Sequence, residues 1–188
     1  MEKTHQTAVV LSPSETDWPS IQAIRKKYDR NFRRWMPHIT LLYPFVPKDQ
    51  FEQIVEKFGI ACRGIDPFDV ALHNVCYFQH GQRGFTLWLD PESDGGVDRL
   101  QKTIWDVMPE CDDVRIFKNG FTPHLSVGQV KTQKDMDRVL PTVQNTWTPL
   151  IFCASSVALI WRNNPPDDVF QVGYSVILGT GVVQRVKM

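Results

Sequence analysis

The chain contains one five-residue pattern twice, as PHITL at residues 37–41 and as PHLSV at residues 123–127. In both copies a proline precedes a histidine, and an aliphatic residue, a hydroxyl residue and a second aliphatic residue follow. The two histidines, His38 and His124, lie 86 positions apart and are two of only five in 188 residues. At average residue frequencies, one chance recurrence of such a pattern has a probability of about one percent or less. The repeat therefore calls for an explanation.

Each copy predicts a short β-strand, at about residues 37–43 and 122–128, because apolar and polar residues alternate through it. Residues i and i+2 of a strand point to the same face. His38 therefore shares a face with Thr40, and His124 shares one with Ser126. A proline fits the start of a strand, where its missing N–H is tolerated. Each copy thus presents an imidazole beside a hydroxyl, over an apolar backing.

Two such copies suit the cleavage of a phosphodiester. A single histidine in an apolar strand is more often a hydrogen-bonded structural residue. Two of them, brought together across a cleft, can act as the base that accepts a proton from the attacking water or hydroxyl and the acid that protonates the leaving oxygen. The two hydroxyls can donate hydrogen bonds to the non-bridging phosphate oxygens. The repeat favours this catalytic interpretation over the structural one.

On these motifs, HITL at 38–41 and HLSV at 124–127, the chain resembles the two-histidine phosphoesterase superfamily, which includes the RNA ligase-like cyclic phosphodiesterases. The longer contexts WMPHITLLY and FTPHLSVG are similar to the family's as well. The resemblance implies an α+β fold that is bilobal, with pseudo-two-fold symmetry. Each lobe would be an antiparallel-rich sheet with flanking helices, and the central cleft would carry both motifs. Residues 1–188 are expected to form one two-lobed domain.

The resemblance also implies a metal-independent phosphodiesterase, without a cofactor, that acts on RNA ends, cyclic nucleotides or short oligonucleotides. The leading substrates are 2′,3′-cyclic phosphates and 2′,5′-linked oligoadenylates, and strand joining is less favoured. His38 and His124 would be the acid–base pair, in interchangeable roles, and Thr40 and Ser126 would hold the phosphate. Two alternatives stay open: a module that binds a nucleotide or RNA end without catalysis, and a scaffold in which the repeated strands are structural.

Other residues are candidates for binding the substrate. Gln129 stands five residues after the second histidine, where ligase-like members often carry an arginine, and glutamine cannot neutralise a phosphate. Arg162 and Lys118 are candidates for that phosphate contact, because cationic side chains bind phosphate. Tyr43 and Trp35 are candidates for stacking on a base. Core packing of the aromatic residues and a solvated strand end at Arg162 are the structural alternatives.

A run of basic residues precedes the first motif and includes a single acidic residue, Asp29. A solvated helix face is the default interpretation of such a run. The alternative is a positive rim that attracts a phosphorylated ligand to the cleft. The basic residues of the run are Arg25, Lys26, Lys27, Arg30, Arg33 and Arg34.

The bulk composition excludes several classes of protein. With 21 basic and 21 acidic residues, the chain does not coat long nucleic acids by charge alone. It contains no apolar run of about 18 residues and no secretion signal at residues 1–6, so no membrane partner is expected. Four scattered cysteines, without a Cys-x-x-Cys pair, indicate reduced thiols and a cytoplasmic or nuclear location. A monomer is expected.

No metal site is expected from the sequence. His73, Cys76 and His80 are residue types that bind zinc, but positions 73 and 76 of a strand point to opposite faces, and a fourth ligand is lacking nearby.

Hydrophobic periodicity and turn residues predict the remaining elements. Residues 179–188 are expected to form a loose tail. The predicted helices cover residues 17–29, 50–58, 97–107 and 133–140, the last ending before Pro141. Further strands are predicted at residues 7–11, 68–78, 85–89, 150–152, 157–161 and 169–178. The helices recur around the two motif strands in a similar order, which is consistent with duplicated halves.

Overall fold

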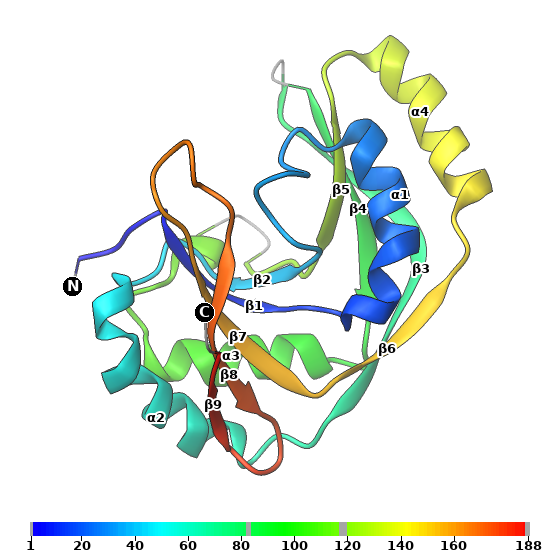
Figure 1. Cartoon of the computed structure of the whole chain (residues 1–188). Helices are drawn as coiled ribbons and strands as arrows, with labels where there is room; N and C mark the ends of the chain where they lie inside the picture. The colour runs from blue at the N-terminus through cyan, green and yellow to red at the C-terminus, as the bar shows by residue number, and fades with distance from the viewer. Residues whose placement is uncertain (1, 82–83, 117–119, 187–188) are drawn as a thin grey trace.

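The structure is a computed structural model, and it describes residues 2–81, 84–116 and 120–186. Its framework is an antiparallel sheet with the strand order β6-β3-β4-β5-β2-β1-β7-β8-β9 (Figure 1). The strands are β1 (Thr7–Leu11), β2 (Ile39–Leu42), β3 (Phe68–Gln79), β4 (Phe85–Glu92), β5 (Leu125–Val130), β6 (Leu150–Ala154), β7 (Ser156–Trp161), β8 (Gln171–Ile177) and β9 (Val183–Arg185). The helices are α1 (Trp18–Tyr28), α2 (Phe51–Cys62), α3 (Gly96–Val107) and α4 (Gln133–Thr146).

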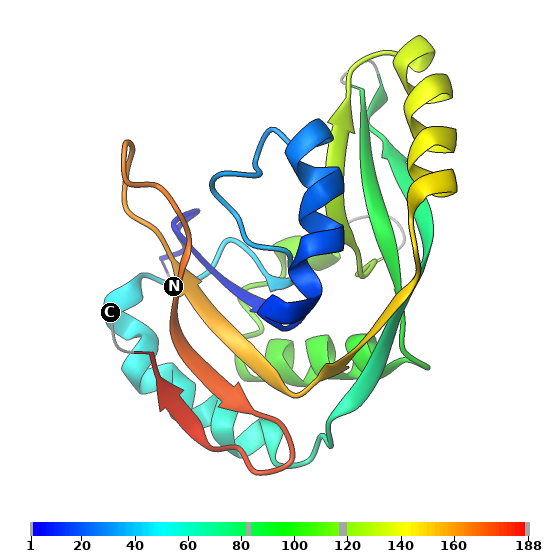
Figure 2. The same cartoon turned by 45° about the vertical axis from the view of Figure 1, so that its right-hand side comes forward.

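The two motif strands are neighbours at the centre of this sheet. β2 and β5 run antiparallel, with Ile39 opposite Leu125. On one side of this junction lie β5, β4, β3 and β6, and on the other lie β2, β1, β7, β8 and β9. The two halves splay apart, with α1 and the segment that follows it between them (Figure 2). The expected α+β class is confirmed, and the strands of the two halves form one continuous sheet.

The helices connect the two halves reciprocally. α1 follows β1 of one half and packs on β5 of the other, whereas α3 follows β4 and packs on β2. α2 packs on α3 and β8, and α4 packs on β3. The motif strands lie against the resulting core, because Leu41 and Val127 are fully buried, as are Ile39 and Leu125. The apolar backing predicted for both motifs is therefore present.

The predicted end of the last helix is wrong. α4 continues through Pro141 to Thr146. A proline inside a helix costs about 3 kcal/mol, since it removes one hydrogen bond and crowds the preceding turn. Packing beyond the proline offsets this cost: Val143 is buried, and the indole Nε1 of Trp147 donates a hydrogen bond of 2.8 Å to the carbonyl of Leu72.

The predicted loose tail is also wrong. β9 pairs antiparallel with β8, with Val183 opposite Val176 and Arg185 opposite Tyr174. A tight turn connects the two strands, and Gly181 adopts a φ of +66° in it, a conformation that glycine accepts without steric cost. α2 is longer than predicted and ends at Cys62, which is fully buried. α2 and β9 are in contact with each other.

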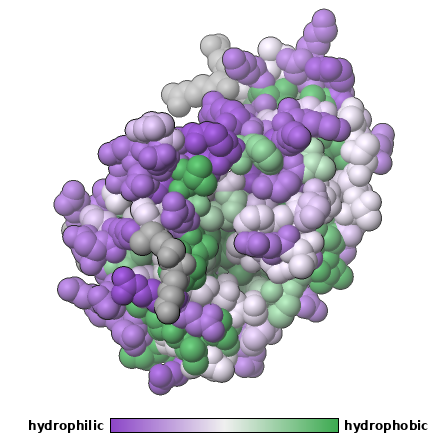
Figure 3. Space-filling view, in the orientation of Figure 1, coloured by the Kyte–Doolittle hydropathy of each residue, from purple (hydrophilic) through white to green (hydrophobic). Residues whose placement is uncertain are grey.

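Hydrophilic side chains cover most of the face in Figure 3, and apolar side chains show in patches near its centre and lower edge. All four cysteines are free thiols. Within the described ranges, none of the helices has both the length and the apolar character needed to cross a bilayer.

Candidate active site

Both motif histidines are held by the same local contact. His38 and His124 come just before the first residue of β2 and β5, so the observed strands begin later than predicted. His38 Nδ1 lies 2.7 Å from the carbonyl oxygen of Met36, and His124 Nδ1 lies 2.8 Å from that of Thr122. A carbonyl only accepts hydrogen bonds, so each Nδ1 carries the proton. In the neutral ring Nε2 is then the basic nitrogen.

The register of β2 and β5 brings the two motifs together. Because Ile39 pairs with Leu125 in an antiparallel register, His38 lies toward Ser126 and Thr40 lies toward His124. These four side chains share the face opposite to the buried pair. All four line one cavity of about 760 Å³. The structure thus places two imidazoles and two hydroxyls, from segments far apart in the sequence, in one cavity wall.

The surroundings favour the neutral form of both imidazoles. Burial lowers the pKa of His38 to about 4; the hydrogen bond to Met36 opposes this shift, and the positive charge of Arg25 adds to it. Burial also lowers the pKa of His124, with the hydrogen bond to Thr122 acting in the opposite direction and His80 in the same one. Both rings are therefore able to accept a proton at neutral pH.

Aromatic side chains fix the planes of both rings. Trp35 stacks on His38, with 4.6 Å between ring centroids and 16° between planes. Phe78 meets His124 edge-on, at 5.1 Å and 89°. Trp35 also contacts Tyr43, at 5.5 Å, and both of these predicted base-stacking residues line the cavity. Their role in binding stays a prediction.

The structure describes one of the two cations predicted to bind phosphate. Among the described residues, Arg162 is absent from the cavity lining; its guanidinium lies 5.5 Å from the centre of the Phe170 ring and donates to the carbonyl of Asn163. Lys118 lies outside the described residues. Gln129 does line the cavity, where its side-chain oxygen accepts a hydrogen bond of 3.1 Å from the backbone N–H of Arg30.

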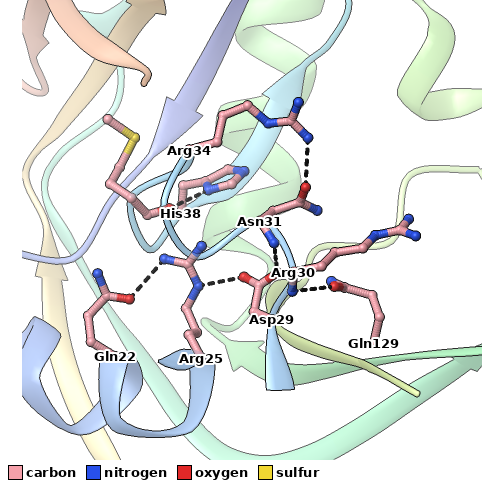
Figure 4. Close-up of polar contacts among 9 residues, drawn as sticks. Gln22, Arg25, Asp29, Arg30, Asn31, Arg34, His38 and Gln129 are labelled. Atoms are coloured by element: carbon pink, nitrogen blue, oxygen red, sulfur yellow. Dashed lines mark hydrogen bonds and ion pairs between the residues drawn. The ribbon is translucent and has the colours of Figure 1, made fainter. Parts of the chain in front are cut away.

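Three arginines bring positive charge to the cavity. Arg25, in the last turn of α1, and Arg30 and Arg34, in the segment that follows it, line the cavity (Figure 4). Lys26 and Lys27 are exposed on α1. The sequence indicated the whole run without distinguishing its members. One signal could have separated them: Arg25 follows Ile21 by four positions, which places it on the buried face of the helix.

The other histidines have different surroundings. His73 Nδ1 lies 3.1 Å from a carboxylate oxygen of Glu92, and His80 Nε2 lies 3.0 Å from the hydroxyl of Thr86. His80 lines the same cavity as the motif histidines. In the part of the chain that the structure describes, no three His, Cys, Asp or Glu side chains are grouped as a metal site would require.

Comparison with known proteins gives the same family by sequence. Residues 13–166 match the family model of the 2′-5′ RNA ligase superfamily. A protein of Bacillus cereus strain G9842, provisionally named a phosphoesterase, is 27% identical over 131 residues, which are 64% of this chain and 67% of that protein. A protein of Bacillus anthracis strain A0248 with the same provisional name gives the same identity and coverage.

Solved structures share the fold. Escherichia coli LigT complexed with 3′-AMP superposes with a TM-score of 0.59 at 12% identity, over 93% of this chain and 98% of LigT. LigT complexed with phosphate gives 0.58 at 12% identity, over 94% and 99%. A protein of Thermus thermophilus gives 0.57 at 18% identity, over 92% and 97%. Since the family model covers both motifs and most of the chain, this protein belongs to the 2′-5′ RNA ligase superfamily of two-histidine phosphoesterases.

Proposed function

We propose that this phosphoesterase is a metal-independent phosphodiesterase that acts on RNA ends or small oligonucleotides. Its leading substrates are 2′,3′-cyclic phosphates and 2′,5′-linked oligoadenylates. One observation carries the proposal: two imidazoles with the same proton-bearing nitrogen, Nδ1, line one cavity together with Thr40 and Ser126. The related LigT structures that contain 3′-AMP and phosphate support a nucleotide ligand.

The proposed reaction uses the two free Nε2 atoms. His38 accepts a proton from the attacking water as the new bond from oxygen to phosphorus forms. His124, protonated, donates its Nε2 proton to the leaving oxygen as the old bond breaks. Thr40 and Ser126 donate hydrogen bonds to the non-bridging oxygens. Burial lowers the pKa of both imidazoles, so His38 is neutral and able to accept a proton, while the negative charge of a bound phosphate favours the protonated form needed at His124.

A second candidate is a module that grips a nucleotide or RNA end without turning it over. Trp35, Tyr43 and the three arginines give the cavity wall aromatic faces and positive charge, which are sufficient for binding alone. Both histidines and both hydroxyls are present in the cavity, which supports the catalytic candidate.

A substrate panel in excess chelator separates the two candidates. The panel contains 2′,3′-cyclic nucleotides and 2′,5′- and 3′,5′-linked oligoadenylates, with products identified chromatographically. We expect turnover of a 2′,3′-cyclic or 2′,5′-linked substrate, and a loss of about 10²–10⁴-fold in His38→Ala and in His124→Ala. His73→Ala is the matched control, because this histidine is exposed and bonds to Glu92 instead.

Three outcomes of these measurements would contradict different parts of the proposal. Binding of panel compounds without turnover by the unmodified protein would identify the binding module. Activity that the chelator abolishes would contradict the metal-independent mechanism. Unchanged turnover in both motif variants would remove the two histidines from the reaction.

A further inference from the structure

A buried arginine lies in the wall of the cavity. Arg25 is only 2% exposed and is among the largest fully buried side chains, yet it is a lining residue of the cavity. Arginine is almost never buried to this extent unless its charge is paired. Its position at the end of α1, just before the segment that leads to His38, brings a fixed positive charge to the catalytic motif.

Three contacts hold this guanidinium in one orientation. Nε donates a hydrogen bond of 2.8 Å to Asp29 Oδ2, and Nη1 donates one of 3.0 Å to Gln22 Oε1. The ring of Phe32 lies 6.0 Å from the guanidinium carbon. Asp29 is itself fixed, because its Oδ1 accepts a hydrogen bond of 2.8 Å from the backbone N–H of Asn31. A side chain that normally has large rotational freedom is therefore pre-organised.

The third nitrogen of the guanidinium is left for another partner. Nη2 has no hydrogen-bond partner among the described residues, and Figure 4 shows the free end of the guanidinium directed toward His38. The positive charge of Arg25 also lowers the pKa of His38, so the two groups are close enough to interact. Two N–H donors are thus available beside the imidazole that we assign as the base.

A gain in folding stability does not explain why the Arg25–Asp29 ion pair is buried. A buried ion pair is often no more stable than well-packed apolar side chains of the same volume, because removing both charges from water is costly. Gln129 lines the same cavity as a neutral side chain, and its oxygen accepts a hydrogen bond from the backbone N–H of Arg30. Of the three arginines that line the cavity, Arg25 is the buried one.

We propose that Arg25 binds a non-bridging oxygen of the scissile phosphate through Nη2. Asp29 and Gln22 act as positioning residues, since both accept hydrogen bonds from the guanidinium and hold it in place. The inference rests on the proposed phosphodiesterase function for its kinetic consequence. Its binding consequence, affinity for phosphate, can be measured without turnover.

The kinetic test removes the buried charges as a pair. Arg25→Gln combined with Asp29→Asn leaves no unpaired buried charge, and Arg25→Lys keeps the charge while losing the fork of donors. We expect kcat/KM to fall roughly 10²-fold or more in the double variant and by less in Arg25→Lys. Lys26→Gln, which removes an adjacent exposed positive charge, is the matched control and should stay within about twofold. Circular dichroism and Tm check that each variant folds.

A sulfur substitution in the substrate gives a readout that a structural role would not change. Replacing one non-bridging oxygen by sulfur gives two phosphorothioate diastereomers. The unmodified protein should turn over more slowly the one that has sulfur in place of the oxygen that Arg25 binds. In Arg25→Lys this diastereomer preference should shrink severalfold. An unchanged preference, together with unchanged kcat/KM in the double variant, would overturn the proposal.

Phosphate binding separates this inference from the proposed function. Titration of inorganic phosphate, followed by the imidazole signals in NMR, should give at least tenfold weaker binding in the double variant than in Lys26→Gln. Suppose that the unmodified protein turns over no substrate, but the double variant binds phosphate at least tenfold more weakly than Lys26→Gln. The proposed function then fails and the Arg25 site stands. Equal phosphate affinity in the two variants would overturn the Arg25 site.

Discussion

The proline before each motif histidine explains how the imidazole is oriented. A proline fixes its own φ and disfavours helical backbone at the residue before it. The carbonyls of Met36 and Thr122, which precede the prolines, are the acceptors for the Nδ1–H of His38 and His124. The pattern Pro-His therefore restricts the backbone that carries the acceptor and leaves Nε2 as the basic nitrogen of each ring. This is a residue-scale reason for the repeated proline.

The low pKa of His38 has a consequence for stability. An unfolded histidine titrates near pH 6.5, whereas burial lowers the pKa of folded His38 to about 4. Below pH 6.5 the unfolded chain therefore binds more protons, and the free energy of unfolding falls as the pH drops from about 6.5 through 4. The loss from this residue reaches about 3 kcal/mol.

Urea unfolding at pH 7.5 and pH 4.5 measures this effect. We expect His38→Gln to lose less stability between the two pH values than the unmodified protein does, by about 2 kcal/mol. Other titrating groups are common to both proteins and cancel in the comparison. An equal pH dependence in both would show that His38 titrates normally in the folded state.

At the scale of elements, the contact of α1 with β5 positions the cationic segment. Gly128 in β5 lies directly under Tyr28 of α1, and a Cβ at this position would lie 2.6 Å from the Tyr28 Cβ. We expect Gly128→Ala to push α1 away, to destabilise the protein by about 1–3 kcal/mol and to lower kcat/KM. Gly64→Ala is the control, because its Cβ would meet nothing closer than 3.8 Å.

Urea unfolding and steady-state kinetics on both glycine variants check this expectation. A Gly128→Ala protein with unchanged stability and activity would show that the helix is free to shift without consequence for the site.

Local patterns predicted most elements because each has a clear signal. The apolar runs of β1 and β7 and the apolar stripes of α1 and α3 are visible in the sequence. The errors arose where tertiary contacts outweigh local preference. Burial of Val143 carries α4 past Pro141, and pairing with β8 orders the residues after Gly179. The local sequence signals neither contact. α4 packs on β3, which is distant in the chain, and β9 is separated from β8 by a turn.

The candidate site was predictable to a similar extent. The repeat indicated the four motif side chains, and the structure places them in one cavity. It could not indicate which basic residues face inward. The helical spacing of Arg25 from Ile21 is a signal for that residue alone, and the places of Arg30 and Arg34 depend on how the segment after α1 folds. Arg162 shows the converse: its place at a strand end suggested a phosphate contact, but the strand ends beside Phe170 and away from the cavity lining.

At the scale of the whole molecule, the site exists only where the two halves meet. β2 and β5 come from different halves, and the pair Ile39–Leu125 sets the register between them. Each half supplies one imidazole and one hydroxyl. The three arginines come from the chain between β1 and β2. In the proposed mechanism, the two imidazoles work as one acid–base unit on one phosphate.

The kinetics of His38→Ala, His124→Ala and the double variant test this claim most directly. Groups that act as a unit show strongly non-additive losses, because removing one already disables the other. We predict that the double variant has a kcat about equal to that of the slower single variant, on whichever panel substrate the unmodified protein turns over. Losses that multiply in the double variant, or a single variant with unchanged kcat, would contradict the account.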